Sequence, residues 1–519
     1  MPSIDQMITE LEICLHPYSC PAQAQADIVL RSSDRVDFYV VKAFLRYVSP
    51  FFKDLFELDQ EFITEEHEER KGLVVIPVME TSDTLRLLLD YIYPQETEPQ
   101  LNDAALFLKS AKAAQKYCME KIENKFKKRI LDSSLMNSEP FRMYVIAVDL
   151  GWEDVATHAA QRTLNWPLKM LDPVNELRNI SGSGFYRFLE YRLRCENSSN
   201  RSVEELAIFP MAASQPTTSS SNLGMRPNGE VDQTSGAIDA QTPFDSSATS
   251  DIILRSSDGI DFFVLEILIR IASPSLGLTI LSETAKGHVR NGRAVVQIPE
   301  ESSILHHMLC FIYPYSDQLD MHNCQSYIQV VLAIRRHGMA AIEARLRTQA
   351  ASTPLCRKEP LRAYIVASAL GWDDLAKSAA LNTLYRPLAD MRYTEEFNLI
   401  TGADLQRLVS FRFRCADAAC RVITSNTMYK THGPGKWSLG PSPDHYGPTA
   451  ELFSDLRIRP RGTTIVDAYK QETEQLGAHV YDSRASQRSS FGKSTLHQIL
   501  QCRQEMEAAV EAAVTEVLS

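Results

Sequence analysis

The stretch Asp27-Ile28-Val29-Leu30-Arg31-Ser32-Ser33-Asp34 recurs 224 residues later as Asp251-Ile252-Ile253-Leu254-Arg255-Ser256-Ser257-Asp258. The match continues without a gap to Pro50 and Pro274, and 13 of 24 positions are identical. A second match, at an offset of 220, pairs Glu139–Leu164 with Glu359–Leu384, with 14 of 26 positions identical. A period this long is that of a folding unit, whereas solenoid repeats are a few dozen residues long. The sequence therefore predicts two copies of one domain plan.

Short β-branched and aromatic runs in the first copy predict a β-hairpin. Ile28–Leu30 and Phe38–Val41 are such runs, and the turn-forming residues Ser32–Asp34 lie between them. Apolar residues at helical spacing predict helices over 42–48, from Pro50 onward, over 84–93 and twice within 104–130, with a third strand over 73–76. This order of strands and helices is typical of an α+β domain of about a hundred residues.

The remaining segments differ in composition. Residues 198–248 are rich in Ser, Thr, Gln, Asn, Pro and Gly, and such a stretch cannot bury enough apolar surface to offset its chain entropy. In the first extension we expect Trp152 to anchor two helices in the core. The predicted organisation is an N-terminal segment (1–22), a first domain (23–131) with a helical extension (132–197), a disordered linker (198–248), a diverged second domain (249–348) with its extension (349–422), a Gly/Pro-rich, mostly irregular tail (423–494) and a C-terminal helix (495–518).

The bulk composition excludes several classes of protein. The 519 residues carry a formal net charge of −12, which argues against direct binding of nucleic acid. No signal sequence and no apolar stretch of membrane-spanning length is present, so the sequence predicts a cytoplasmic or nuclear protein without a membrane contact. The ten cysteines lack the paired spacing of a zinc site or a disulfide framework, and no metal or cofactor is predicted.

The sequence also lacks the signatures of an enzyme. The stretch Phe491–Thr495 is similar to part of a phosphate-binding loop, but Gln487 stands where the first glycine is required and no strand precedes it. No nucleophile–base motif is present. We therefore expect a protein that binds other proteins and does not catalyse a reaction.

Three motifs stand out in the first copy: an Asp-Ile-Val-Leu start, a Ser-Pro-x-Phe motif and the Tyr-Ile-Tyr end of a Leu-rich helix. They are at Asp27–Leu30, Ser49–Phe52 and Tyr91–Tyr93. On this pattern both copies resemble a BTB (POZ) domain, and the combination resembles the tandem BTB proteins of mushroom-forming fungi. The resemblance implies self-association or hetero-association, and in some members recruitment of a cullin-type ubiquitin ligase. The alternative is a nuclear transcription co-regulator that acts through protein partners.

The resemblance also indicates candidate partner-binding residues. In many BTB domains the early Asp and a Lys form a charged pocket at the dimer groove, which Asp27 and Lys42 would keep; Asp251 with Glu266 would lose it to charge repulsion. Cullin-binding members carry a hydrophobic-x-Glu element just after the second core helix. Two stretches lie at about that place, namely Ile63-Thr64-Glu65 and Leu281-Ser282-Glu283.

Finally, the loop charges of the two copies differ in sign. The loop Asp59–Lys71 contains six acidic and two basic residues, whereas Ser282–Arg293 contains Glu283 against three basic residues. Opposite charges at equivalent places favour pairing of one copy with the other within the chain.

Overall fold

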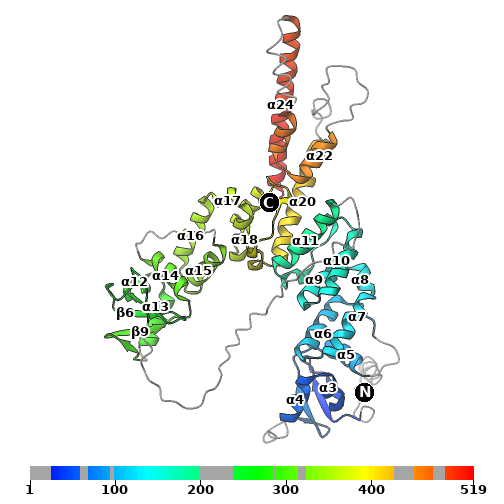
Figure 1. Ribbon diagram of the computed structural model, residues 1–519, viewed down its shortest axis with the longest axis vertical. Helices are drawn as coiled ribbons and strands as arrows, with labels where there is room; N and C mark the ends of the chain where they lie inside the picture. Colours follow the sequence, from blue (N-terminus) through cyan, green and yellow to red (C-terminus); the bar gives the residue numbers. More distant parts are fainter. Residues whose placement is uncertain are drawn as a thin grey trace, which may run out of the picture. The chain divides into compact units, whose positions relative to one another are not determined.

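The computed structural model of the chain describes residues 25–58, 68–93, 99–197, 238–284, 287–313, 323–425, 449–470 and 486–518 (Figure 1). Its contacts divide the chain into two compact units. The first comprises Met1–Ile180 and Arg187–Ala213, and the second comprises Ser181–Tyr186 and Ser214–Ser519.

A four-stranded sheet in the order β2-β1-β4-β3 lies in the first unit. β1 pairs antiparallel with β2, which confirms the predicted hairpin, and parallel with β4. The three residues Ile28, Val29 and Leu30 are all buried, so both faces of β1 are covered. The strands are β1 (Ile28–Arg31), β2 (Asp37–Val40), β3 (Glu69–Arg70) and β4 (Leu73–Pro77).

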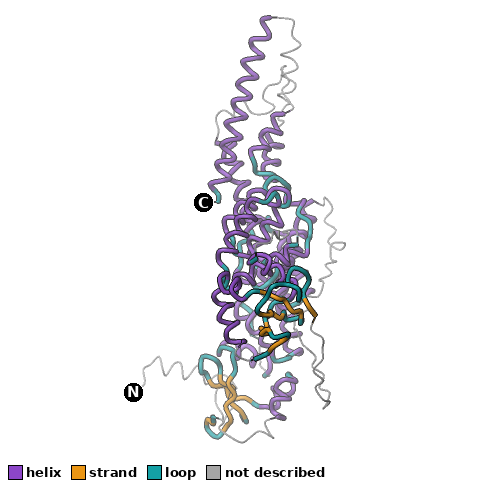
Figure 2. The backbone as a smooth tube through the Cα atoms, turned by 90° about the vertical axis from the view of Figure 1, so that its left-hand side faces the viewer, coloured by secondary structure: helices purple, strands orange, loops and turns teal. Residues whose placement is uncertain are grey.

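The helices that the structure describes in this α+β domain lie at the predicted places. Figure 2 shows the strands of this unit gathered at one end, with helices along the rest of it. Phe52, Phe107 and Phe126 are among its most deeply buried large side chains. The helices are α3 (Lys42–Val48), α4 (Pro50–Leu58), α5 (Ser82–Ile92), α6 (Ala104–Lys116) and α7 (Glu120–Leu131).

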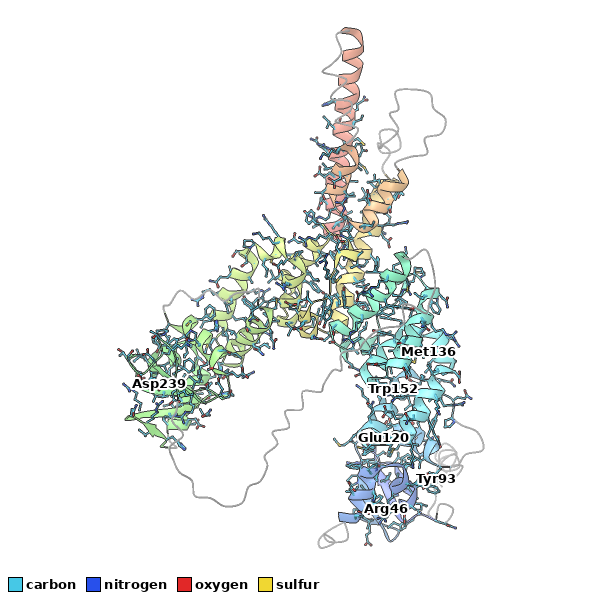
Figure 3. All side chains as sticks on the ribbon, viewed as in Figure 1. Arg46, Tyr93, Glu120, Met136, Trp152 and Asp239 are labelled. Atoms are coloured by element: carbon cyan, nitrogen blue, oxygen red, sulfur yellow. The ribbon has the colours of Figure 1, made fainter. Side chains whose placement is uncertain are left out.

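The extension that follows is helical, as predicted. Gly151 ends α9 in the left-handed conformation (φ 73°), which a residue without a side chain adopts at little cost. Trp152 comes next and is 3% exposed, which confirms its prediction as a core anchor. In Figure 3, Trp152 and Met136 are labelled in this helical layer, away from Arg46 beside the sheet. The helices are α8 (Ser134–Ser138), α9 (Pro140–Leu150), α10 (Glu153–Arg162) and α11 (Gly182–Asn197).

The second copy repeats this plan with an additional strand. Its sheet has the order β5-β7-β6-β9-β8, with β6 antiparallel to β7 and parallel to β9. The strands are β5 (Ile238–Asp239), β6 (Ile252–Arg255), β7 (Ile260–Val264), β8 (Val289–Arg290) and β9 (Arg293–Gln297). The helices are α12 (Glu266–Ala272), α13 (Pro274–Thr284), α14 (Ser302–Ile312), α15 (Cys324–Arg336) and α16 (Ala340–Ser352), then α17 (Leu355–Lys358), α18 (Pro360–Leu370), α19 (Asp373–Thr383) and α20 (Gly402–Ser425) in the extension.

The predicted linker boundary at 248 was wrong, because residues 238–248 lie within the second copy. β5 pairs in parallel with β7. Phe244 is 1% exposed and its ring packs against Phe262 and Tyr313, with centroid distances of 6.3 and 5.2 Å. The segment 238–248 is polar in composition, but it is held in place by the buried Phe244 and by the two residues of β5. The rest of the predicted linker, 198–237, lies outside the described residues.

The tail differs from the irregular segment predicted over 423–494. Its described part is helical in α22 (Thr449–Ile458), over 462–470, and in α24 (Ser486–Glu516), which begins nine residues before the predicted start. Both α22 and α24 pack on α20. The helix α24 forms because it buries an apolar stripe of residues spaced three and four apart. The fully buried residues of this stripe are Ile499, Cys502, Met506, Val510 and Val514.

Candidate interaction surface

A helical hairpin follows the first strand pair in each copy, formed by α3–α4 and by α12–α13. Both hairpins are held to the helix α6 or α15 by the serine between their two helices. Ser49 Oγ donates to the carbonyl of Tyr117 (2.6 Å), and Ser273 Oγ donates to the carbonyl of His337 (2.5 Å). These buried serines fix each hairpin where its chain turns, and we call the solvent-exposed side of each hairpin its outer face.

The early aspartate of each copy caps the first helix of this hairpin. Asp27 Oδ1 accepts from the backbone N–H of Lys42 (2.6 Å), and Asp251 Oδ1 accepts from the backbone N–H of Glu266 (2.7 Å). The Lys42 ammonium instead lies over the Phe56 ring, 5.6 Å from its centroid. Both aspartates thus bond to the backbone of the first helical residue, and no ion pair between the Asp27 and Lys42 side chains is found among the described residues. The role of these residues in partner binding stays a prediction.

The outer face of the first hairpin is aromatic and charged. Phe44, Tyr47 and Phe51 are 38%, 72% and 43% exposed. An ion pair between Arg46 and Glu57 (3.3 Å) joins α3 to α4 across the same hairpin. The first hairpin thus carries a charged pair in addition to its exposed aromatic rings.

The outer face of the second hairpin is aliphatic. Ile267 and Ile271 on α12 are 55% and 73% exposed, and Leu278 and Leu281 on α13 are 69% and 49% exposed. We call these four residues the aliphatic surface. At an offset of 224 their counterparts in the first copy are Ala43, Tyr47, Asp54 and Glu57. The second copy therefore has leucines where the first has two acids.

This surface was not predicted from the sequence. Single exposed apolar residues are common on proteins, but a group of large ones on two packed helices is typical of a binding site. The signal was present in α13, where Leu276 and Ile280 are buried on one side while Leu278 and Leu281 are exposed. A helix that is apolar beyond its buried stripe indicates a second contact.

The predicted cullin-binding stretch of the second copy is helical. Leu281 and Glu283 lie in the last turn of α13, which ends at Thr284, so they are part of the helix and do not follow it. Leu281 is half-exposed and Glu283 is partly buried. The other stretch, with Ile63 and Glu65, lies outside the described residues.

A carboxylate in each copy ties the α+β domain to its extension. Glu123 on α7 accepts from the indole N–H of Trp152 (2.6 Å) and forms an ion pair with Lys127 (3.1 Å). Glu343 on α16 accepts from the indole of Trp372 (3.3 Å). Burial alone would raise the pKa of Glu123, but hydrogen bonds from Lys127, Trp152 and Gln115 lower it below its ordinary value.

We expect acid to weaken this junction. A carboxyl whose pKa is lower in the folded state stabilises the fold fully above its unfolded pKa, about 4.5. That stability is lost as the pH falls through the lowered folded pKa. The melting temperature should therefore fall less between pH 5 and pH 3 in Glu123→Gln than in the wild type. Glu120→Gln, which changes an exposed residue of the same helix, is the control. An equal fall in melting temperature between pH 5 and pH 3 in Glu123→Gln and in the wild type would contradict the role of Glu123.

Several of the loop charges that the structure describes form ion pairs within their own copy. In the second copy, Arg290 forms ion pairs with Asp239 (2.9 Å) and with Asp261. In the first, Glu68 pairs with Arg31 (2.5 Å). Residues 59–67 and 285–286 lie outside the described residues. These internal pairs weaken the electrostatic argument for pairing of one copy with the other.

Among the residues that the structure describes, no three His, Cys, Asp or Glu side chains are grouped as they would be around a metal ion. In the same ranges, no helix is long and apolar enough to span a membrane.

The first copy matches a known domain family. A BTB/POZ domain is detected at residues 20–134, which include the sheet and the helices α3–α7. No curated protein matches the chain. BTB domains mediate protein–protein association and dimerisation, and the domain detected in the first copy points to protein–protein interaction in general.

Proposed function

We propose that this protein works by protein–protein association, without catalysis, and that its second copy provides the contact between two chains. The proposal extends the BTB/POZ assignment of the first copy to the second, which is predicted over residues 249–348. It is supported by the shared order of strands and helices and by the shared serine and aspartate bonds. The observation that carries it is the exposed aliphatic surface on α12–α13.

The chemistry of this surface favours pairing with the same surface of a second chain. A two-fold interface brings each patch against its own copy, so charged residues near the axis would meet like charges. The aliphatic surface avoids this problem. Arg270, the cation on α12, pairs with Glu266 on the same helix (3.4 Å). The equivalent face of the first copy carries Glu57, which pairs with Arg46 (3.3 Å), and Asp54, which would meet its own copy across a two-fold axis.

Co-capture of two differently tagged full-length chains tests the association. We expect the chain with the second tag to be retained when the first tag is captured after co-expression, because apolar burial stabilises the pair. Recovery of the captured chain alone would contradict the proposal.

A role as adaptor for a cullin-type ubiquitin ligase is the second candidate. The observation that favours it is the half-exposed Leu281 beside Glu283 at the end of α13. An exposed apolar residue followed by an acid at this place is the element through which BTB-type adaptors are expected to bind a cullin. The stretch Ile63–Glu65 of the first copy, which lies outside the described residues, is the alternative contact.

For this candidate we expect Leu281→Ala combined with Glu283→Lys to reduce binding of a purified cullin N-terminal domain by roughly 30-fold. Loss of an apolar anchor at the centre of an interface commonly costs about 2 kcal/mol. Val289→Ala, a change at an exposed residue of β8, is the control. Binding that is unchanged in the double variant would remove α13 from the contact, and absence of binding to the wild type would exclude the adaptor role.

A further inference from the structure

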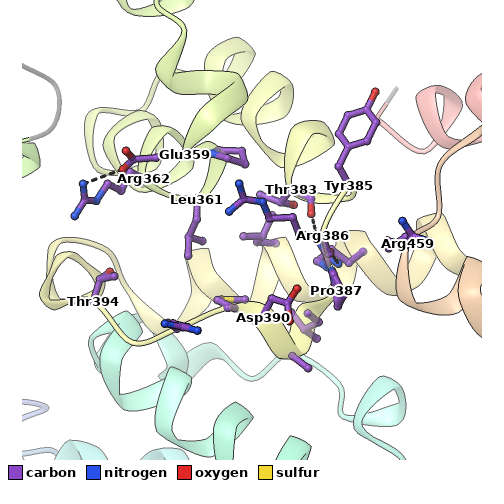
Figure 4. A pocket seen from close by; sticks show the side chains of 17 residues that line it. Glu359, Leu361, Arg362, Thr383, Tyr385, Arg386, Pro387, Asp390, Thr394 and Arg459 are labelled. Carbon is purple, nitrogen blue, oxygen red and sulfur yellow. Dashed lines mark hydrogen bonds and ion pairs between the residues drawn. The ribbon is translucent and has the colours of Figure 1, made fainter. Parts of the chain in front are cut away.

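An open cleft of about 1040 Å³ lies in the second unit, between the start of α18, the turn after α19, and α20. Figure 4 shows Glu359, Leu361 and Arg362 along one side, with Asp390 facing them and Arg459 at one end. Apolar side chains form much of the lining, including Leu361, Leu388, Met391 and Leu408. The cleft therefore combines an apolar floor with charged walls.

The charge of the lining is positive. Two of its arginines are already engaged. Arg412 is buried and donates to the carbonyls of Thr383 and Arg386, and Arg362 forms ion pairs with Glu359 (2.9 Å) and Glu396 (3.2 Å). The acids of the lining are Glu359 and Asp390, and its arginines are Arg362, Arg386, Arg392, Arg412 and Arg459.

Two other arginines have N–H groups that are available to a ligand. Arg386 is exposed and makes one long hydrogen bond, to the carbonyl of Lys358 (3.4 Å). Arg392 is exposed and has no hydrogen bond or ion pair with any residue that the structure describes. A guanidinium carries five N–H donors in a planar fork that matches a carboxylate. These two side chains can therefore bind an anion without breaking an internal contact of the fold.

Comparison with the first copy shows that the fold does not require these arginines. At an offset of 220, Trp166 occupies the place of Arg386 and Asp172 that of Arg392. The turn is nevertheless built alike, since Arg192 donates to the carbonyl of Trp166 as Arg412 donates to that of Arg386, each at 2.6 Å. The two exposed arginines are thus particular to the second copy.

We propose that this cleft binds an acidic peptide segment that also carries apolar side chains. The carboxylates would pair with Arg386 and Arg392, and the apolar side chains would lie on Leu361 and Leu388. A lone phosphate would use the cations and leave the apolar floor empty. The volume, at the upper end of the roughly 300–1,000 Å³ usual for small-molecule pockets, suits several residues of a peptide.

The test uses the full-length protein and a labelled synthetic peptide with the sequence Asp59–Glu69 of this chain. That sequence contains six acids and the apolar pair Phe62–Ile63. We expect saturable binding by fluorescence anisotropy that weakens as salt is raised, because the cations are exposed. Arg386→Gln combined with Arg392→Gln should weaken it at least about tenfold, since hydrogen bonds to charged groups are the stronger ones.

Matched controls keep the result specific. The variant Arg386→Trp with Arg392→Asp introduces the residues of the first copy, which the same turn accepts, and should also lose binding. Arg407→Gln, an exposed change on α20 outside the cleft, should bind like the wild type. The proposal is overturned if the wild type does not bind the peptide, or if the double variants bind it equally well. It is also overturned if the labelled peptide is displaced as effectively by inorganic phosphate, or by a peptide in which Gln replaces every acidic residue.

Discussion

Trp152→Ala is expected to lower the free energy of unfolding of the first unit by about 3–5 kcal/mol, the range for truncating a buried large aromatic residue. The indole is 3% exposed, packs on Phe107 at 5.9 Å between ring centroids, and donates to Glu123 at 2.6 Å. The substitution removes the packing and leaves a buried carboxylate short of a donor. Denaturant unfolding followed by circular dichroism measures the loss.

Trp166→Ala is the matched control for this prediction, because Trp166 lies in the same unit and is 39% exposed. Trp166→Ala should lower the free energy of unfolding much less than Trp152→Ala does. Trp152→Phe should fall between the two, since it keeps a ring and loses the N–H. A loss below about 1 kcal/mol for Trp152→Ala would show that this side chain does not anchor the extension.

Ile271→Asp combined with Leu278→Asp is expected to weaken association of the full-length chain at least about 100-fold. Each substitution appears twice in a two-fold interface and places carboxylates in an apolar contact, so several kcal/mol are lost. Both residues are exposed, at 73% and 69%, so the fold itself should be unaffected. The dissociation constant is measured by dilution of a fluorescently labelled chain into unlabelled chain.

Val289→Asp provides the control, since Val289 is 64% exposed in the same copy but lies on β8. It should associate like the wild type. Equal weakening by Val289→Asp and by the α12–α13 variant would indicate a general effect of added charge. Unchanged association in the α12–α13 variant would place the contact elsewhere.

The local elements of the fold were predictable because their signals are local. A β-branched run on either side of a Ser-Ser-Asp turn predicts β1 and β2, and Pro50 predicts the start of α4. Gly151 likewise predicts the end of α9, and its φ of 73° explains why glycine is favoured there. The repeat then transfers each of these elements to the second copy.

The features that were missed depend on tertiary contacts. β5 has two residues, and it is a strand because it pairs with β7. Leu276 and Leu278 are the same residue type two positions apart, yet one is buried and the other 69% exposed. The bond between Asp27 and the N–H of Lys42 was missed because the sequence suggests a contact with the side chain, while the geometry of the helix start presents a backbone donor.

The mass of the full-length chain in solution tests the central claim most directly. Sedimentation velocity over a range of concentrations should give a particle of twice 58.5 kDa for the wild type. The variant Ile271→Asp/Leu278→Asp should give 58.5 kDa under the same conditions. A wild-type chain that remains a monomer at every concentration, or a dimer that persists in the variant, would contradict association through α12–α13.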